Sequence, residues 1–360
     1  MFWRDRTKAG TRPRRGSGRR RATRLTATGS VTTGLVTTGK AGSVLLASVL
    51  LLSACTASPR PTADQPAIAH SAPPAVAPSS TAPSSTPQSS SPGEATLQHV
   101  VIIVDENKPA ATVLGNPAAP YLNGLAHTFA SATDYSGVTH PSLPNYLALT
   151  GGTTAGITSD CNPPRGSCHA HGKNLGDELV ASGRSWKFYA ESMPAACTAV
   201  NSGRYAVKHN PFLYYPDVTA KVAYCDSHDV PYGRLAADLA SPATLPSYSF
   251  VSPDLCDDMH DCSIATGDAW LAHNVPQILG SPAFTTQRSL LVITFDEGES
   301  GNNVVPCIFA GPAARRAYST ATPYNHYSLL RTVEEQWGLA PLAAGDAAAV
   351  PMNEMLSPAG

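Results

Sequence analysis

Two apolar runs that end in acidic residues decide the fold: VVIIVDEN at residues 100–107 and LLVITFDEG at residues 290–298. A continuous apolar run of this length is typical of a parallel strand that is buried on both faces. Ligand sites in open α/β sheets lie beyond the carboxyl ends of the strands. The two runs therefore predict buried strands whose acidic ends meet at one edge of a sheet.

Apolar runs alternate with helical patterns along the rest of the chain. Strands are predicted at 99–104, 131–135, 185–190, 247–252, 289–295 and 304–309, and helices at 118–129, 143–150, 173–182, 233–240, 266–279 and 326–337. This alternation predicts an α/β fold, a three-layer α/β/α sandwich with a mostly parallel central sheet. Residues 151–172 and 191–230 fit neither pattern, and long ordered loops of this kind often carry function.

The first 54 residues have the pattern of an export signal. A basic start is followed by an apolar stretch at 44–52 that is too short to span a bilayer, and then by LSAC at 52–55. LSAC resembles the bacterial lipobox, in which the cysteine, here Cys55, becomes lipid-modified; ordinary signal cleavage beside an incidental cysteine is the alternative. The expected location is the extracytoplasmic face of the cell membrane, through that anchor, or the medium after secretion.

The organisation after the signal is a tether and one domain. Residues 55–96 are dominated by Ser, Pro, Thr and Ala, and such a segment cannot bury enough apolar surface to fold. We expect it to be a disordered tether after the lipidated cysteine. Residues 97–360 are expected to form the catalytic domain.

Net charge excludes one class of partner. Residues 1–54 hold eleven of the 25 basic residues and one of the 26 acids, so their removal leaves a net charge of about −11. Binding to a nucleic-acid backbone needs a basic surface. No nucleic-acid partner is therefore expected, and the sequence indicates no oligomeric state.

Cysteine usage agrees with export, because disulfides persist outside the cytoplasm. Close spacing favours the pairs Cys161–Cys168 and Cys256–Cys262, and Cys197–Cys225 would be the remaining bridge, although connectivity does not follow from sequence alone. Cys307, in an apolar run, is expected to be a buried free thiol. A zinc site is the alternative, but no CxxC pair is present.

Oxygen ligands follow both apolar runs. Glu106 with Asn107, and Asp296 with Glu297, could serve only as helix caps or turn residues. Taken together at two strand ends, these side chains predict a site for a hard divalent cation.

Ser142, in THPSLPNY at residues 139–146, is the predicted nucleophile. A serine hydroxyl needs a base or a metal to activate it, and a cation at the acidic strand ends would do so. Asn145, one helical turn later, could donate its amide to a phosphoryl oxygen. The alternative is that Ser142 only caps the helix at 143–150.

Four histidines are candidates for the same chemistry. His260, near Asp258 in DLCDDMHDC at residues 254–262, follows a strand and is predicted to be functional. His209 lies in an irregular loop, and His326 could either cap the last predicted helix or act in catalysis. His140 precedes Pro141, which holds it extended beside the nucleophile.

Five short motifs, taken in order, resemble those of the bacterial phosphoesterase family of acid phosphatases and phospholipase C enzymes, within the alkaline phosphatase superfamily. They are Glu106-Asn107, PSLPN at 141–145, KHNP at 208–211, Asp258-Met259-His260 and Asp296-Glu297-Gly298. The resemblance implies an alkaline phosphatase-like fold. It implies that Ser142 and the four residues at the strand ends hold a metal, and that His209 and His260 contact phosphate or protonate the leaving group.

Ser142 to Asn145 is also similar to the nucleophile-x-Pro-Asn motif of nucleotide pyrophosphatases, which use two zinc ions. The second ligand set is not evident here, so we expect one divalent cation.

The function expected from these observations is hydrolysis of a phosphoric ester through a phosphoseryl intermediate. A phosphomonoesterase acting on a small-molecule or lipid phosphate ester is favoured, because phospholipase C members tend to be longer. A phospholipase C-type phosphodiesterase is the first alternative. A solute-binding lipoprotein without catalytic activity is an alternative of another class.

Overall fold

An eight-stranded sheet lies at the centre of the structure, a computed structural model that describes residues 96–299 and 302–358. The expected signal segment, Cys55 and the tether up to residue 95 lie outside the described residues. Among the described helices, none combines the length and apolarity needed to cross a membrane.

The sheet order places the two deciding runs side by side at its centre. From one edge to the other the strands are β5 (Asp229–Pro231), β4 (Trp186–Ala190), β6 (Tyr248–Ser252), β1 (His99–Asp105), β7 (Ser289–Phe295), β8 (Cys307–Ala310), β2 (Ala130–Ala132) and β9 (Tyr318–Thr320). All pairings are parallel except those of β8 with β7 and with β2. The mostly parallel sheet is therefore confirmed, with β8 as its antiparallel member.

Two predicted strands differ from the structure. The segment 131–135 divides into β2 and β3 (Tyr135–Ser136), and β3 pairs with β10 (Tyr324–Asn325) in a separate two-stranded sheet. The strand predicted at 304–309 begins only at Cys307, since Pro306 has no N–H to give to a ladder. The short strands β5 and β9 were not predicted, because three residues are too few to show a period.

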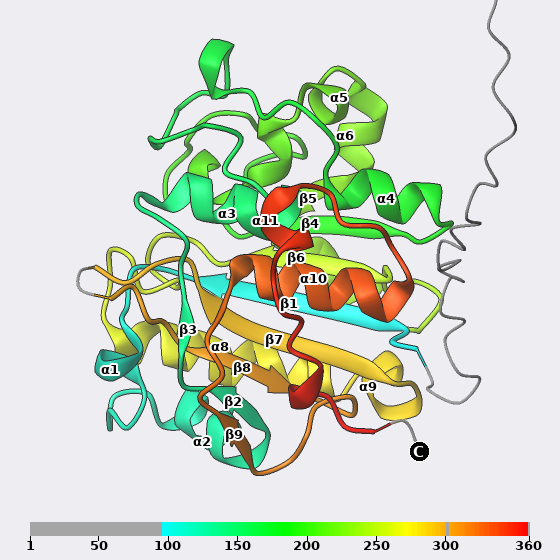
Figure 1. The fold of residues 1–360 in the computed structure, drawn as a ribbon. Helices are drawn as coiled ribbons and strands as arrows, with labels where there is room; N and C mark the ends of the chain where they lie inside the picture. The colour runs from blue at the N-terminus through cyan, green and yellow to red at the C-terminus, as the bar shows by residue number, and fades with distance from the viewer. Residues whose placement is uncertain (1–95, 300–301, 359–360) are drawn as a thin grey trace, which may run out of the picture. The chain divides into compact units, whose positions relative to one another are not determined.

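Helices cover both faces of the sheet, as Figure 1 shows. One face carries α3 (Ser142–Gly151), α4 (Leu175–Ala181) and α10 (His326–Trp337), and the other carries α2 (Pro120–Thr128), α8 (Ile264–Leu279) and α9 (Pro282–Thr286). This arrangement confirms the predicted three-layer α/β/α sandwich. The predicted helix at 233–240 is instead a 3₁₀ turn, η4 (Tyr232–Arg234), followed by the short α7 (Leu235–Asp238).

The remaining helices are short and lie mainly in the segments that showed no pattern. They are α1 (Ala110–Val113), α5 (Pro216–Thr219), α6 (Val222–His228), α11 (Ala344–Ala347), and the 3₁₀ helices η1 (Gly166–Cys168), η2 (Val207–His209), η3 (Pro211–Tyr214) and η5 (Asn353–Met355).

Local sequence explains where α4 begins and ends. Asn174 and Asp177 form a reciprocal capping box at its start. The helix stops before Gly183, whose φ of +76° is a left-handed conformation that glycine adopts without strain.

Burial of β1 and β7 stabilises the centre of the fold. Every residue of both strands is buried. Each large aliphatic side chain removed from water in this way contributes about 1.5–3 kcal/mol. The rigid core therefore fixes the position of the residues that follow the two strands.

Three disulfides join segments outside the sheet, and they are the three predicted pairs. Cys307 is a free, buried thiol, as expected. Six cysteines are therefore paired with one another, which is not the arrangement of a zinc site. The Cys256–Cys262 pair closes the loop directly after β6, and the Cys161–Cys168 pair lies in the long segment after α3.

Candidate functional site

The acidic ends of β1 and β7 meet, because the two strands are adjacent and parallel. Asp105 is in register with Phe295, so the residues after each strand leave the sheet side by side. The backbone N–H of Asn107 donates to Asp296 Oδ1 at 3.0 Å. Both Glu106 and Asp296 are fully buried.

Ser142 lies against this pair of strand ends. It is the first residue of α3, and Pro141 occupies the N-cap position without a side-chain cap. The Ser142 hydroxyl donates to Glu106 Oε2 at 3.1 Å. Ser142 is therefore not a helix cap, and its side chain belongs to the carboxylate cluster.

Glu106 accepts hydrogen bonds from three side chains, those of Ser142, Tyr146 and Asn107. Its Oε1 accepts from the Tyr146 hydroxyl at 2.6 Å, and its Oε2 accepts from Asn107 Nδ2 at 3.0 Å. Burial, followed by the charges of Asp296 and Asp258, raises the pKa of Glu106 well above its usual range. Several carboxyl groups are thus held together away from water, which is costly unless cations or hydrogen bonds compensate their charge.

His209, on η2, lies between two of these carboxyl groups. Its Nε2 is 3.1 Å from Glu106 Oε1, and its Nδ1 is 3.3 Å from Asp258 Oδ2. Neither contact is aligned as a hydrogen bond, since His209 Nε2 and Asp258 Oδ2 have no hydrogen-bond partner among the described residues. Burial, with the charges of Lys208 and His260, lowers the pKa of His209 well below its usual range.

His260 approaches the cluster from the disulfide-closed loop after β6. Its Nδ1 lies 2.7 Å from Asp261 Oδ1, and its Nε2 lies 3.3 Å from Lys208 Nζ. A histidine that donates from Nδ1 to a carboxylate turns its other nitrogen, Nε2, to the opposite side of the ring, which here is the side of Lys208. Asp258, in the same loop, accepts from the backbone N–H of His260 at 2.8 Å, and burial foremost raises its pKa to about 8.

Asn145 and His140 both contact Glu297. Asn145 Nδ2 donates to Glu297 Oε2 at 3.1 Å and also to the carbonyl of Thr139 at 2.9 Å. His140 Nδ1 lies 2.9 Å from the same Glu297 oxygen. The Asn145 amide therefore already has protein partners, and it fixes the loop before Ser142 as well as the Glu297 carboxylate.

His326 contacts the backbone of the site residue Asp296 and is not one of the side chains that surround Ser142. It is the first residue of α10, after the capping residue Asn325, and it is fully buried. Its Nδ1 lies 2.8 Å from the Tyr135 hydroxyl, and its Nε2 contacts the carbonyl of Asp296. Burial lowers the pKa of His326 to about 4, so the ring is neutral near pH 7.

Four side chains in or beside this cluster, Tyr146, Lys208, Asp160 and Asp261, were not among the predicted site residues. Tyr146 and Lys208 lie inside quoted motifs, one residue after Asn145 and one before His209, and this adjacency was the available signal. Asp160 lies in the unpatterned segment after α3, where no sequence period indicates which residues reach the site. Lys208 Nζ is 3.1 Å from Asp160 Oδ2 and 3.3 Å from Ser142 Oγ.

A second group of carboxylates lies nearby at the ends of β4 and β6. Glu191, Asp254 and Asp257 bring their oxygens within 4.8 Å of one another and could hold a cation. Glu191 accepts from the Trp270 indole at 2.9 Å and from the backbone N–H of Asp254 at 3.0 Å. The sequence motifs did not indicate this group.

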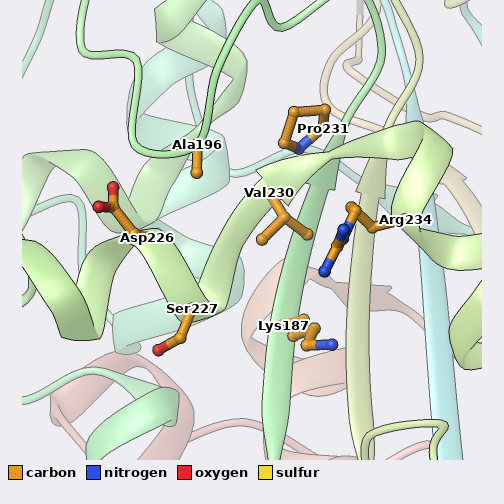
Figure 2. Close-up of a pocket in the computed structure, with 7 residues that line it drawn as sticks. All are labelled: Lys187, Ala196, Asp226, Ser227, Val230, Pro231 and Arg234. Atoms are coloured by element: carbon orange, nitrogen blue, oxygen red, sulfur yellow. The ribbon is translucent and has the colours of Figure 1, made fainter.

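A surface hollow of about 590 Å³ lies at the sheet edge formed by β5 (Figure 2). Figure 2 shows Lys187 and Arg234 next to each other, with Asp226 and Ser227 across the hollow. Its lining contains no candidate site residue, and β4 and β6 separate β5 from β1 in the sheet. Lys187 is already paired with Asp238 at 2.7 Å.

Comparisons with known proteins place the chain in a family. The model of the Phosphoesterase family matches residues 114–340, a range that begins after Glu106 and Asn107. A phosphatidylinositol-3-phosphatase of Mycobacterium tuberculosis is 38% identical over 246 residues, which cover 68% of this chain and 78% of that protein. A phosphate-repressible acid phosphatase of Penicillium chrysogenum is 28% identical, and the match covers 63% of this chain and 57% of the fungal protein.

Solved structures show the same fold at low sequence identity. The murine ectonucleotide pyrophosphatase/phosphodiesterase 5 superposes with a TM-score of 0.51 at 10% identity, covering 73% of this chain and 100% of that chain. The alkaline phosphatase-like architecture expected from the motifs is therefore confirmed.

Proposed function

Because the chain belongs to the Phosphoesterase family and is a phosphoric ester hydrolase, we propose that it is an exported, metal-dependent phosphomonoesterase with Ser142 as nucleophile. The observation that carries this proposal is the 3.1 Å contact of Ser142 Oγ with Glu106, inside a cluster that also holds Asp296. Residues far apart in the sequence thus surround one hydroxyl. Membership of this family argues against the alternative of a binding protein without catalytic activity.

The site chemistry fits a divalent cation. Glu106, Asp258 and Asp296 are buried, and Asp296 Oδ2 has no hydrogen-bond partner among the described residues. Carboxylate, amide and hydroxyl oxygens are the ligands that hard cations prefer. Glu106, Asn107, Asp296 and Glu297, together with Ser142, would hold one such ion. When bound, the ion would neutralise charge on the nucleophile and on the phosphoryl oxygens.

The side chains of the site would orient the Ser142 hydroxyl and transfer the protons of the reaction. Glu106 Oε2 accepts the Ser142 O–H and so orients the hydroxyl towards the phosphorus. The Ser142 Oγ–P bond forms as the P–O bond of the ester breaks in line, and the Ser142 proton passes to Glu106 Oε2, which already accepts it in a hydrogen bond. His260 delivers a proton from Nε2 to the departing alcohol, while Asp261 holds the ring through Nδ1. Water then attacks the phosphorus and gives a proton to His260 Nε2, while the Ser142 Oγ–P bond breaks and Glu106 returns the proton to Ser142 Oγ, so that phosphate is released.

His260 is better suited than His209 to protonate the leaving group. The His209 side chain is only 3% exposed and lies between two carboxyl groups, whereas that of His260 is 28% exposed. The leaving alcohol departs towards solvent, so its proton donor must be accessible. His209 instead separates Glu106 from Asp258.

The names of the relatives favour a phosphomonoester over a diester as substrate, because two of them are phosphatases. The monoester could be a soluble metabolite or a lipid headgroup. Export is supported by the three disulfides and by the signal and lipobox patterns of residues 1–55, and Cys55 would anchor the chain to the membrane.

The proposal is tested by assaying a chromogenic phosphate monoester with the wild type, Ser142→Ala and Asp296→Ala. Loss of about 10³-fold or more in kcat is expected for each variant, since each removes a group that acts directly on the reacting atoms. Ser227→Ala, a surface change in the hollow at β5, is the matched control and should behave as the wild type. Unchanged turnover in Ser142→Ala would remove the assignment.

A further inference from the structure

Lys208 places a positive charge at the nucleophile. Its Nζ lies 3.3 Å from Ser142 Oγ, 3.1 Å from Asp160 Oδ2 and 3.3 Å from His260 Nε2. An ammonium group has three N–H donors and no acceptor, so Ser142 Oγ and Asp160 Oδ2 can each receive one hydrogen, and His260 Nε2 can do so while its ring is neutral, before it takes up the proton for the leaving group. The side chain is 18% exposed and therefore has little freedom to leave this position.

Asp160 fixes the lysine and the nucleophile to each other. Its Oδ2 accepts from Lys208, and its Oδ1 accepts from the backbone N–H of Leu143 at 3.0 Å. Leu143 follows Ser142 in the first turn of α3, so one carboxylate holds both the ammonium and the start of the nucleophile helix. Asp160 directly precedes Cys161, whose disulfide with Cys168 constrains this part of the loop.

We propose that Lys208 is a catalytic residue that selects dianionic phosphate monoesters over monoanionic diesters, and that Asp160 is its positioning residue. This inference rests on the proposed function and names the substrate class of the same site. Lys208 lies between the nucleophile Ser142 and the proposed acid His260. A phosphoryl group that is attacked by Ser142 while His260 protonates its leaving oxygen lies beside both residues. Its oxygens therefore come next to the Lys208 ammonium.

The charges around the site explain why such a residue is needed. Glu106, Asp258, Asp296 and Glu297 all present carboxyl groups to the region that receives an anionic substrate. A monoester dianion brings one more negative charge than a diester, and it therefore gains more from a fixed cation. Lys208 stays protonated throughout: Ser142 Oγ bonds to phosphorus as its proton passes to Glu106, the ester P–O bond breaks, and the leaving oxygen takes its proton from His260.

A purely structural ion pair would have a different signature. If Lys208 served only to hold Asp160 and the loop, its removal would lower stability, and it would lower turnover of all substrates by the same factor. A role in recognising charge instead changes the ratio between substrates. The ratio of kcat/KM for a monoester to that for a diester is therefore the decisive quantity.

The test uses the full chain with p-nitrophenyl phosphate and bis-p-nitrophenyl phosphate as substrates, and inorganic phosphate as an inhibitor. Lys208→Met should lower kcat/KM for the monoester about 100-fold, the range seen when one donor to a developing charge is removed. The diester should lose less than about 10-fold, and the inhibition constant of phosphate should rise in parallel with the monoester loss. Lys208→Arg should keep most of the monoester preference, because it keeps the charge.

Two further variants control the test. Lys173→Met removes a 69%-exposed lysine paired with Glu178 and should match the wild type. Asp160→Asn keeps the Lys208 side chain but removes the charged partner that fixes its position. It should therefore lower the monoester-to-diester ratio of kcat/KM by a smaller factor than Lys208→Met does. This variant also provides the test if Lys208→Met does not fold.

Three outcomes are distinguishable. A Lys208→Met variant that keeps the wild-type substrate ratio and phosphate inhibition overturns the inference, and an equal loss on both substrates does so too. If diester turnover is too slow to measure, an unchanged inhibition constant for phosphate overturns it. If Ser142→Ala is as active as the wild type, the proposed function itself fails.

Discussion

The Tyr146 hydroxyl donates a 2.6 Å hydrogen bond to Glu106 Oε1. The Tyr146 ring also stacks on His209, with ring centroids 5.3 Å apart and planes 10° from parallel. One side chain of α3 thus orients the carboxylate at the end of β1 and supports the neighbouring histidine. Because Ser142 lies one helical turn earlier on α3, the proposed nucleophile and the Glu106 carboxylate are positioned by the same helix.

Tyr146→Phe should therefore lower kcat by about 10-fold and the free energy of unfolding by about 1–3 kcal/mol, the cost of leaving a buried acceptor without its donor. Steady-state kinetics and thermal unfolding measure the two effects. Tyr232→Phe, which changes a tyrosine that packs on Trp270, is the matched control. Wild-type kinetics in Tyr146→Phe would show that Glu106 does not depend on this hydroxyl.

The Cys256–Cys262 disulfide should matter for catalysis as well as for stability. It closes the loop that carries Asp258 and His260, so its loss lets both side chains leave the site. We expect Cys256→Ser/Cys262→Ser to lose about 2–4 kcal/mol of stability. We also expect kcat to fall more than 10-fold, which is the cost of misplacing a catalytic group.

Cys197→Ser/Cys225→Ser is the comparison, because that pair lies outside the candidate site. Its stability should fall by a similar amount, with kcat of the folded protein largely retained. Equal effects on kcat in the two double variants would count against a positioning role for the Cys256–Cys262 loop.

Glu334 makes the stability depend on pH. This side chain of α10 is buried, and burial, followed by the neighbouring Asp346 carboxyl, raises its pKa to about 9 against the opposing charge of Arg331, whose Nη1 lies 3.5 Å from Glu334 Oε2. The folded state therefore holds a proton that the unfolded state releases near pH 4.5. Its contribution to stability is complete below about pH 4.5 and is lost progressively as the pH rises towards 9.

Glu334→Gln, which cannot ionise, should match the wild type at pH 5 and unfold several degrees higher at pH 9. Thermal unfolding at both pH values measures this difference. Glu335→Gln, which changes the neighbouring residue and keeps Glu334, is the control and should unfold at the wild-type temperature at both pH values. A Glu334→Gln variant that tracks the wild type at every pH would contradict a buried, protonated Glu334.

Removal of divalent cations should abolish activity and lower the Tm. A bound cation stabilises the folded state by about 2.7 kcal/mol at a concentration 100 times its Kd, and the buried carboxylates would otherwise repel one another. The assay compares the Tm and kcat with and without a chelator, followed by readdition of single cations.

Two variants identify which carboxylates hold the ion. The Tm of Asp296→Asn should no longer respond to the chelator, whereas that of Asp257→Asn, in the second carboxylate group, should respond as in the wild type. The opposite pattern would move the cation to Glu191, Asp254 and Asp257.

The central strands were predictable because a strand buried on both faces is a continuous apolar run. The convergence of Glu106 and Asp296 was also predictable, since the carboxyl ends of parallel strands lie at the same edge of a sheet. The antiparallel direction of β8 was not predictable, because an apolar run does not show whether its strand is parallel or antiparallel to its neighbours.

The long loops set the limit of prediction at the site. Ser142 and His260 stand in short motifs, but Asp160 reaches the site through the path of a loop without any period. Nothing in the sequence around Lys208 and Tyr146 distinguishes them from other lysines and tyrosines. Their roles follow from contacts with Ser142 and Glu106, which lie far from them in the chain.

The phosphoserine itself gives the most direct test. Acid quenching during turnover of a phosphate monoester, followed by peptide mass spectrometry, should find phosphate on Ser142 in the wild type. His260→Ala should also label with an activated aryl ester, because a good leaving group needs no proton donor, while Ser142→Ala should not label. Turnover by the wild type without phosphate on Ser142, or labelling of a different residue, would contradict the account.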